Sequence, residues 1–570
     1  MTTHIPPSPT SHAQTPTNLL SSPLLVSLSF SHFAFSMGQA GSAPLTRFPS
    51  FSNRRFNSKP DLTTPTLAIS FPPPSIQSST LPPDLDYTSE LPDEVLCVVF
   101  QLLTSSDRKR CSLVCRRWLL LEGMSRQRLA LNAQHSLSDS IPSLFDRFSS
   151  VSKLALKCDR RSDSIGDEAL ALIARRCPGL TRLKLRACRA VTDAGMEVLA
   201  ESCPNLCKLS VGSCSFGSKG IEAVLRACTR LEELSIKRLR GLSDSNASPP
   251  VSDEIVARSL RAVCLKELYN GQCFSTVISN SPNLKVLKLF RCAGDWDPIL
   301  EDISVKVLGV TEIHLEKLQV SDRGLMALSA CPSLEVLHLV KTPECTDVGL
   351  IVLAEKCNLL RKIHIDGWKT NRIGDQGLIA IAKRCPNLQE LVLIGVNPTA
   401  RSLELVATNC ANLERLALCG SETFGDAEIS CIAAKCLALK KLCIKGCPIS
   451  DLGMEALAEG CPRLVKVKVK KCRGVTAEFA EWLRMSRGSL AVNFDAPGPT
   501  DGAPDVSEMV ENAGSDGDLD DRSVVGEQLG LSNGNALNGG TRTSAWKTRV
   551  SIFVGRNFFV SAFRRLHGSQ

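Results

Sequence analysis

The chain has 570 residues, a formal net charge of +9 and 25 cysteines. A charge of this size on so long a chain does not by itself indicate a nucleic-acid ligand. No run of about 18 apolar residues occurs, so we expect no membrane-spanning helix. The sequence has no C-x-x-C pair, P-loop or G-x-S-x-G motif, which argues against a metal site, redox chemistry and the common enzyme classes.

Residues 1–86 are rich in Ser, Thr and Pro and hold few charged residues. Such a segment cannot bury enough apolar surface to offset the entropy of ordering, so we expect it to be disordered. Within it, Met37 and Gly38 begin an M-G-x-x-x-[ST] pattern, which makes Gly38 an N-myristoylation site if translation starts at Met37. The alternative is coincidence, and one acyl chain gives only marginal membrane binding.

Residues 87–130 are predicted to form a small helical module. Pro92 followed by two acidic residues suits the first turn of a helix. Apolar residues then recur at three- and four-residue steps between Val95 and Leu103 and again between Cys111 and Trp118. About forty residues are too few to build much core, so a partner or the following residues must cover the module. The alternative is a simple end cap for the segment that follows.

Residues 131–490 contain a repeated unit of one short strand, a turn and one short helix. Thirteen copies of the strand pattern, spaced 24 to 29 residues apart, begin at Leu154, Leu183, Leu209, Leu234, Val263, Leu287, Ile313, Leu337, Ile363, Leu391, Leu416, Leu442 and Val467. A fixed period of this length with an L-x-x-L-x-L strand predicts a leucine-rich-repeat solenoid of the α/β class, a horseshoe with parallel strands inside and helices outside.

Two further features recur at fixed positions of the repeat. Cysteines at one phase, such as Cys177, Cys203 and Cys228, are expected to be small buried apolar residues with weak S–H donors. Thr/Ser-Asp pairs are expected to begin the helices with a side-chain cap, with glycine one turn in. These pairs start at Thr192, Ser321, Thr346 and Ser450, and the glycines are Gly195, Gly324, Gly349, Gly377 and Gly453.

After the repeats, residues 491–570 differ in charge from one part to the next. Residues 495–521 hold nine acidic residues and no Lys or Arg, which indicates a solvated linker. The last thirty residues hold six Lys or Arg, no acidic residue and several aromatic ones. Membrane contact, docking on the acidic stretch and disorder all remain open for this basic aromatic tail.

The outward-facing strand positions form the candidate target-binding surface. In each strand the apolar pair should face the core, and the residues between and after that pair should face outward. Nine of these positions are Lys or Arg and two are acidic, which favours an acidic or phosphorylated protein target over the alternative of mere solubilisation. The candidate residues are Lys184, Arg186, Lys237, Lys266, Lys288, Phe290, His314, His338, His364, Lys445, Lys468 and Lys470. The three histidines follow one another on successive strands, where a solvated or hydrogen-bonded row competes with a shared metal site or a pH sensor.

The segment LPDEVLCVVFQLL…DRKRCSLVCRRW resembles an F-box, and the Cys-Pro-x-Leu and T/S-D-x-G motifs resemble cysteine-containing leucine-rich repeats of plant F-box proteins. The resemblance implies a substrate-recognition subunit of an SCF-type E3 ubiquitin ligase. Such a subunit binds a Skp-type adaptor, through it a cullin and a RING subunit, and supplies no catalytic residue. The adaptor-binding residues implied are Leu91, Pro92, Val95, Leu96, Val114, Cys115 and Trp118.

Two other functions remain open: a repeat scaffold or inhibitor without ligase coupling, and a lipid-tethered sensor. No cofactor is predicted. The one alternative is an inositol phosphate, which plant hormone receptors of the same broad architecture hold in a basic hollow. We expect the protein in the nucleus, the cytoplasm or both, and at a membrane only if translation starts at Met37.

Overall fold

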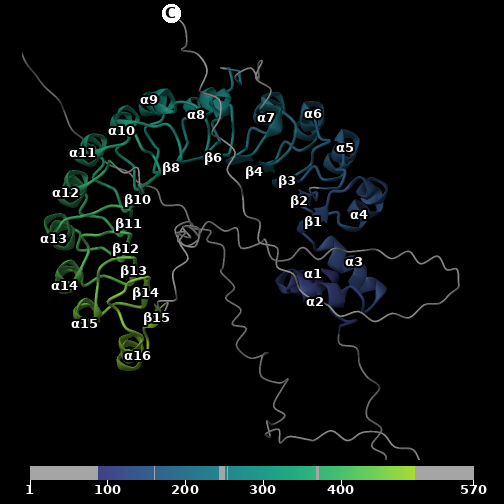
Figure 1. The fold of residues 1–570 in the computed structure, drawn as a ribbon. Coiled ribbons are helices and arrows are strands. Elements are labelled where there is room, and N and C mark those ends of the chain that lie inside the picture. Colours follow the sequence, from purple (N-terminus) through teal and green to yellow (C-terminus); the bar gives the residue numbers. More distant parts are fainter. Residues whose placement is uncertain (1–87, 160, 243–250, 253, 368–371, 495–570) are drawn as a thin grey trace, which may run out of the picture. The chain divides into compact units, whose positions relative to one another are not determined.

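The computed structural model describes residues 88–159, 161–242, 251–252, 254–367 and 372–494. The Ser/Thr/Pro-rich segment with Gly38, the acidic stretch and the basic aromatic tail lie outside these ranges. The described residues form a helical module followed by one long sheet that is covered with helices on one side (Figure 1).

The helical module contains α1 (Asp93–Leu102), α2 (Ser105–Cys111) and α3 (Arg116–Met124). The backbone N–H of Asp107 donates to the Thr104 hydroxyl, which caps α2. Leu96, Phe100 and Leu121 form a separate buried cluster, and the Trp118 ring lies edge-on to Phe100 with 5.3 Å between the ring centroids. The predicted helices are therefore present, around a core of only a few side chains.

One parallel sheet with its strands in chain order, β1 to β15, forms the solenoid. The strands are β1 (Arg128–Asn132), β2 (Lys153–Lys157), β3 (Arg182–Arg186), β4 (Lys208–Gly212), β5 (Glu233–Lys237), β6 (Ala262–Lys266), β7 (Val286–Phe290), β8 (Glu312–Glu316), β9 (Val336–Val340), β10 (Lys362–Asp366), β11 (Glu390–Ile394), β12 (Arg415–Cys419), β13 (Lys441–Lys445), β14 (Lys466–Lys470) and β15 (Ala491–Phe494). The predicted leucine-rich-repeat fold is confirmed, and each of the thirteen predicted strands is present.

The sheet has two strands more than the pattern predicts, one at each end. Leu129 of β1 pairs with Leu154, and Val492 of β15 pairs with Val467, so both strands keep the register of the array. Both strands carry the same pair of apolar residues with one residue between them, Leu129 with Leu131 and Val492 with Phe494, so the strand pattern extends one copy further at each end than predicted. Residues just before β2 are consequently part of the array rather than a simple connection.

The helices lie on the outer side of the curved sheet, and the strands line its inner, concave side (Figure 1). The helices are α4 (Ile141–Arg147), α5 (Asp167–Arg176), α6 (Asp193–Ser202), α7 (Ser218–Ala227), α8 (Ser275–Ser279), α9 (Asp297–Lys306), α10 (Asp322–Leu328), α11 (Asp347–Lys356), α12 (Asp375–Arg384), α13 (Ala400–Asn409), α14 (Asp426–Lys435), α15 (Asp451–Gly460) and α16 (Ala477–Ser486), with short 3-10 helices at His135–Ser140, Arg240–Leu242 and Gly271–Phe274.

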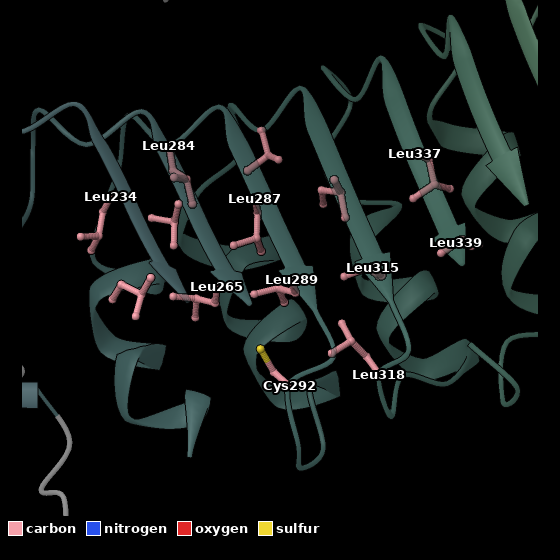
Figure 2. Close-up of a cluster of buried hydrophobic side chains, with 14 of the residues drawn as sticks. Leu234, Leu265, Leu284, Leu287, Leu289, Cys292, Leu315, Leu318, Leu337 and Leu339 are labelled. Carbon is pink, nitrogen blue, oxygen red and sulfur yellow. The ribbon is translucent and has the colours of Figure 1, made fainter. Parts of the chain in front are cut away.

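The core is built from equivalent side chains of successive repeats. Figure 2 shows Leu265, Leu289, Leu315 and Leu339 in one row, and their strand positions are paired directly in the sheet. Behind them, the Cys203 Sγ lies 3.5 Å from the carbonyl oxygen of Cys177, and the Cys228 Sγ lies 3.4 Å from that of Cys203. All 25 cysteines are free thiols, and those of this phase are buried, as predicted.

The Thr/Ser-Asp-x-Gly motif links one repeat to the next. Ser321, Thr346 and Ser450 cap their own helices as predicted, but Thr192 makes no such bond and donates its hydroxyl to Asp167 of the preceding repeat. The Asp322 carboxylate likewise accepts hydrogen bonds from the Thr346 N–H and hydroxyl, at 2.7 and 2.5 Å. A Cβ at Gly349 would lie 2.5 Å from that carboxylate, so the glycine makes room for the aspartate of its neighbour.

Candidate binding surfaces

The helical module exposes a group of large apolar side chains. On α1 and α3 and in the segment between α2 and α3, several valines and leucines are more than one third exposed. They are Leu91, Val95, Val98, Val99, Leu102, Leu113, Val114 and Leu120. We call this group the apolar module surface. So many exposed apolar residues within about thirty positions indicate a surface that a partner covers.

Five of the seven predicted adaptor-binding residues, Leu91, Pro92, Val95, Val114 and Cys115, are exposed. The placement of the other two differs from the prediction. Leu96 is 3% exposed and packs inside the module, and Trp118 is half-buried against Phe100. These two side chains belong to the core because they point from α1 and α3 toward each other, so they support the surface from within.

The predicted adaptor-binding set missed five residues of the apolar module surface: Val98, Val99, Leu102, Leu113 and Leu120. Leu102 and Leu113 are 83% and 82% exposed, more than the leading Leu91. A signal was available, because α1 carries apolar residues almost all around and a short helix can bury only one face.

A single arginine holds the segment that leads into α1. The Arg117 guanidinium on α3 donates to the Asp93 carboxylate at 2.7 Å and to the carbonyl oxygen of Leu91 at 2.5 Å. It also reaches the carbonyl oxygens of Thr88 and Ser89, at 3.1 and 3.2 Å. The Leu91-Pro92 pair is therefore positioned by α3, although 26 residues separate Leu91 from Arg117 in the sequence.

The Glu122 carboxylate joins the module to the repeat array. Glu122 is fully buried and accepts from Arg108 of α2 at 3.2 Å and from Arg126 at 2.5 Å. Arg147 at the end of α4 lies 3.4 Å from the second oxygen of the same carboxylate. The Arg126 and Arg147 guanidinium groups both lie over the Phe148 ring, 5.2 and 4.8 Å from its centroid.

On the concave side of the sheet, the strand register aligns two rows of side chains. One row passes through Lys184, Lys288 and Lys468, and the other passes through Arg186, Lys266 and Lys470. Arg186 and Lys237 are exposed, whereas Lys184, Lys266, Lys288, Phe290, Lys445, Lys468 and Lys470 are half-buried. The basic residues therefore lie toward both ends of the array, as the sequence predicts from their order.

The three histidines lie side by side at strand positions that face the concave side, as predicted, but they are buried there. The ring centroids of His314 and His338 are 3.9 Å apart, and those of His338 and His364 are 5.2 Å apart. All three side chains are buried, with His364 only 4% exposed. The His314 ring bonds to Glu312 at 2.5 Å, and Lys288 lies 2.9 Å from the same carboxylate oxygen. Of the predicted solvated or hydrogen-bonded row, His314 is hydrogen-bonded to Glu312, whereas the three rings are buried against one another and are not solvated.

Burial changes the ionisation of this row. Desolvation, helped by the neighbouring His314 and His364, lowers the pKa of His338 to about 2. Desolvation and the charge of Arg415 lower the pKa of His364 to about 4. Burial would raise the pKa of Glu312, but hydrogen bonds from His314 and Lys288 outweigh it and lower that pKa to about 2. Both His338 and His364 are consequently neutral at physiological pH.

Beyond the histidines, the concave side becomes apolar. Val392 and Ile394 of β11 pack against Ala417 and Cys419 of β12, and Cys443 of β13 borders them. This group, the concave apolar patch, is separate from the main core. Across the described ranges, no set of three or more His, Cys, Asp or Glu side chains is arranged to hold a metal ion.

Known family models match both the helical module and the repeat array. The "F-box-like" family model matches residues 88–121, the module described above. A model described as "FBD-associated F-box protein At5g56370, LRR repeats" matches residues 148–313, and a "Leucine Rich repeat" model matches residues 435–458. The molecule is an array of leucine-rich repeats that carries an F-box-like module at its N-terminal end.

Curated plant proteins, two of them named as F-box proteins, are similar to this chain. The chain is 25% identical over 414 residues to F-box protein MAX2 homolog A of Petunia hybrida, covering 68% of this chain and 54% of that protein. It is 27% identical over 447 residues to GRR1-like protein 1 of Arabidopsis thaliana, covering 66% of this chain and 74% of the relative. F-box protein FBX14 of Arabidopsis thaliana is 26% identical over 422 residues, covering 68% of this chain and 61% of the relative. The chain is thus similar to plant F-box proteins, and the family models mark an F-box-like module and leucine-rich repeats within it.

The chain spans about half the length of the petunia relative. Among solved structures, the yeast Rad7 and Elc1 complex matches with a TM-score of 0.43 and 15% identity, over 70% of this chain and 92% of that one. A Listeria monocytogenes internalin matches with a TM-score of 0.42 and 16% identity, over 64% of this chain and 96% of that one. In the part of the chain that the structure describes, every helix is too short or too polar to cross a membrane.

Proposed function

We propose that this chain is the target-recognition subunit of an SCF-type ubiquitin ligase. The apolar module surface binds a Skp-type adaptor, which connects the chain to a cullin and a RING subunit. The concave side of the repeats binds the target protein, and ubiquitination leads to its degradation. The observation that carries this proposal is the F-box-like module with its exposed apolar side chains.

The mechanism is proximity. The adaptor and the target bind at different places on one chain, which raises the effective concentration of the target near the ubiquitin-charged enzyme. The chain itself supplies no reacting group. The complex acts in the nucleus, the cytoplasm or both, and the basic rows at the ends of the array favour an acidic or phosphorylated target.

The test replaces two exposed leucines of the apolar module surface with a charged residue. Leu102→Glu combined with Leu113→Glu should reduce co-purification of a recombinant Skp-type adaptor by about 100-fold, because charges replace apolar contacts at the centre of the interface. The double variant should keep its melting temperature, since both side chains are more than four fifths exposed in the free chain.

The matched control is Val305→Glu on α9, a 77% exposed valine far along the array. This control should bind the adaptor like the unchanged chain. Equal adaptor binding by the leucine double variant and the control would contradict the proposal. Failure of the unchanged chain to bind any Skp-type adaptor would favour a repeat scaffold without ligase coupling.

A further inference from the structure

The concave apolar patch is buried on the side of the sheet that carries no helices. Val392, Ile394, Ala417 and Cys419 are only 2 to 4% exposed. The helices of the array lie on the opposite side of these strands, and no described helix or strand covers the patch (Figure 1). Apolar side chains in this position are stabilised only if another surface excludes water from them.

A second observation at the edge of the patch also indicates an occupant. The Nε2 atom of His364, next to Val392 in the register, is buried and has no hydrogen-bond partner among the described residues. A buried polar atom without a hydrogen-bond partner destabilises the folded chain. An occupant that supplies a polar group at this point would remove that destabilisation.

The chemistry around the patch defines what fits it. In the same two rows, β13 and β14 place Lys445, Lys468 and Lys470 directly beyond Cys419 and Cys443. Arg415 lies beside the row and bonds to Glu390 at 2.7 Å. The occupant therefore needs apolar side chains followed or flanked by carboxylates.

One segment of this chain combines apolar and acidic residues and begins close to the concave apolar patch. Residues 495–521 follow directly after β15, the strand next to β14. They hold nine acidic residues and no Lys or Arg, with apolar residues among the acids, as in the run DVSEMVE that begins at Asp505. The basic aromatic tail is excluded by charge, because its six Lys or Arg would face the lysines of β13 and β14.

The segment that follows β15 is also long enough to reach the concave apolar patch. Four strand spacings of about 4.8 Å separate β15 from β11, or about 20 Å in all. About six extended residues span that distance, since a residue reaches at most about 3.5 Å. A segment tethered so closely has an effective concentration on the order of millimolar, so even weak binding keeps it in place.

We propose that residues 495–521 dock on the concave side of β10 to β14 in the same molecule and compete there with the target. This proposal rests on the proposed function only in its second half, the competition with a target. The docking itself needs neither an adaptor nor a target and is tested separately from them.

The experiment uses the full chain and reads out docking through Cys443. This thiol borders the concave apolar patch, and a hydrogen bond from Cys419 lowers its pKa, which favours alkylation once it is uncovered. The variant combines Asp505→Asn, Glu508→Gln and Glu511→Gln. Iodoacetamide should alkylate Cys443 about tenfold faster in this variant than in the unchanged chain, because loss of charge weakens docking and increases the open fraction.

Three comparisons make the result specific. The charge-preserving variant Asp505→Glu with Glu508→Asp and Glu511→Asp should protect Cys443 like the unchanged chain. Cys431, a half-buried thiol on the outer helix α14, should be alkylated at the same rate in every form. Raising the salt concentration to 1 M should speed alkylation of Cys443 in the unchanged chain and in the charge-preserving variant but much less in the neutralised variant, because salt screens the acidic segment.

Equal alkylation of Cys443 in all forms would overturn the proposal. Protection of Cys443 that weakens when the protein is diluted would also overturn it, because the occupant would then be a second copy of the chain. Loss of adaptor binding in the leucine double variant would leave these rates unchanged, so the two proposals fail independently.

Discussion

His338 and His364 occupy strand positions that face the concave side, yet they are as buried as core residues. A histidine in water has a pKa near 6.5, and burial lowers the pKa of these two to about 2 and about 4. The cause is mainly desolvation, which disfavours the charged ring. Acidification therefore lowers the free energy of unfolding of the whole chain, because the buried rings resist protonation in the folded state.

The expected pH dependence has a definite sign. Below pH 6.5 the unfolded chain binds protons at these histidines and the folded chain does not, so the free energy of unfolding falls as the pH decreases toward 4. Each histidine contributes about 1.4 kcal/mol per pH unit in this window and nothing above about pH 7. Urea unfolding of the full chain at pH 7.5, 6 and 5 measures the slope.

The matched variants are His364→Leu and His135→Gln. His364→Leu should reduce the slope by about half, because one of the two buried rings no longer titrates. His135 is an exposed histidine in a 3-10 helix, and its replacement should leave the slope unchanged. A slope that His364→Leu does not alter would show that its folded-state pKa is close to that of the unfolded chain.

At the scale of secondary-structure elements, the contact between α3 and α4 decides how the module is joined to the array. Gly123 of α3 lies so close to α4 that a Cβ there would be 2.7 Å from the carbonyl oxygen of Arg147. The neighbouring Glu122 binds Arg108, Arg126 and Arg147, which come from three different elements or connections. This buried carboxylate is therefore the common point of α2, α3 and α4.

The variant Glu122→Gln tests how much the buried carboxylate contributes to the stability of the chain. Removing the charge leaves three arginines around a buried neutral amide, which should destabilise the chain by about 3–5 kcal/mol. Thermal unfolding of the full chain measures the loss, with Glu94→Gln on the exposed side of α1 as the control. A variant as stable as that control would mean that the arginines are already solvated.

At the scale of the whole molecule, 25 thiols are distributed over the helical module and the repeat array without forming a disulfide. The cysteines that recur at one position of the repeat, such as Cys203 and Cys228, are buried against the preceding repeat. Burial raises the pKa of Cys203 to about 12 and that of Cys228 to about 11. Such thiols are poor nucleophiles because little thiolate is present. The cysteines thus stabilise the fold as core residues and not through covalent bonds.

Thiol labelling of the native chain should reflect this distribution. Exposed Cys115 should react with a charged disulfide reagent first. The buried cysteines that recur at one position of the repeat should react only as the array unfolds. A reducing agent should leave the melting temperature unchanged, since no disulfide is present to be broken. Rapid native-state reaction at Cys203 or a fall in melting temperature on reduction would contradict the structure.

Local periodicity was sufficient to predict the repeat, its thirteen central strands and the helical module. Each of these depends on residues within one unit of about 25 positions, whose pattern is repeated many times. The order of charges along the strands likewise predicted that basic residues lie toward both ends of the concave side. The alignment of His314, His338 and His364 followed from the same register.

Contacts between units were decided only by the tertiary structure. The residue that follows a strand adopts a left-handed backbone at eleven strands, but it is glycine at only Gly395, Gly420 and Gly446, so no sequence signal marks it. The Asp322–Gly349 interlock, the Arg117 contact with Leu91 and the burial of Glu122 each join residues from different repeats or helices. Sequence spacing shows which face of its own element a side chain occupies, whereas burial and partners depend on the neighbouring element, and only folding brings the two together.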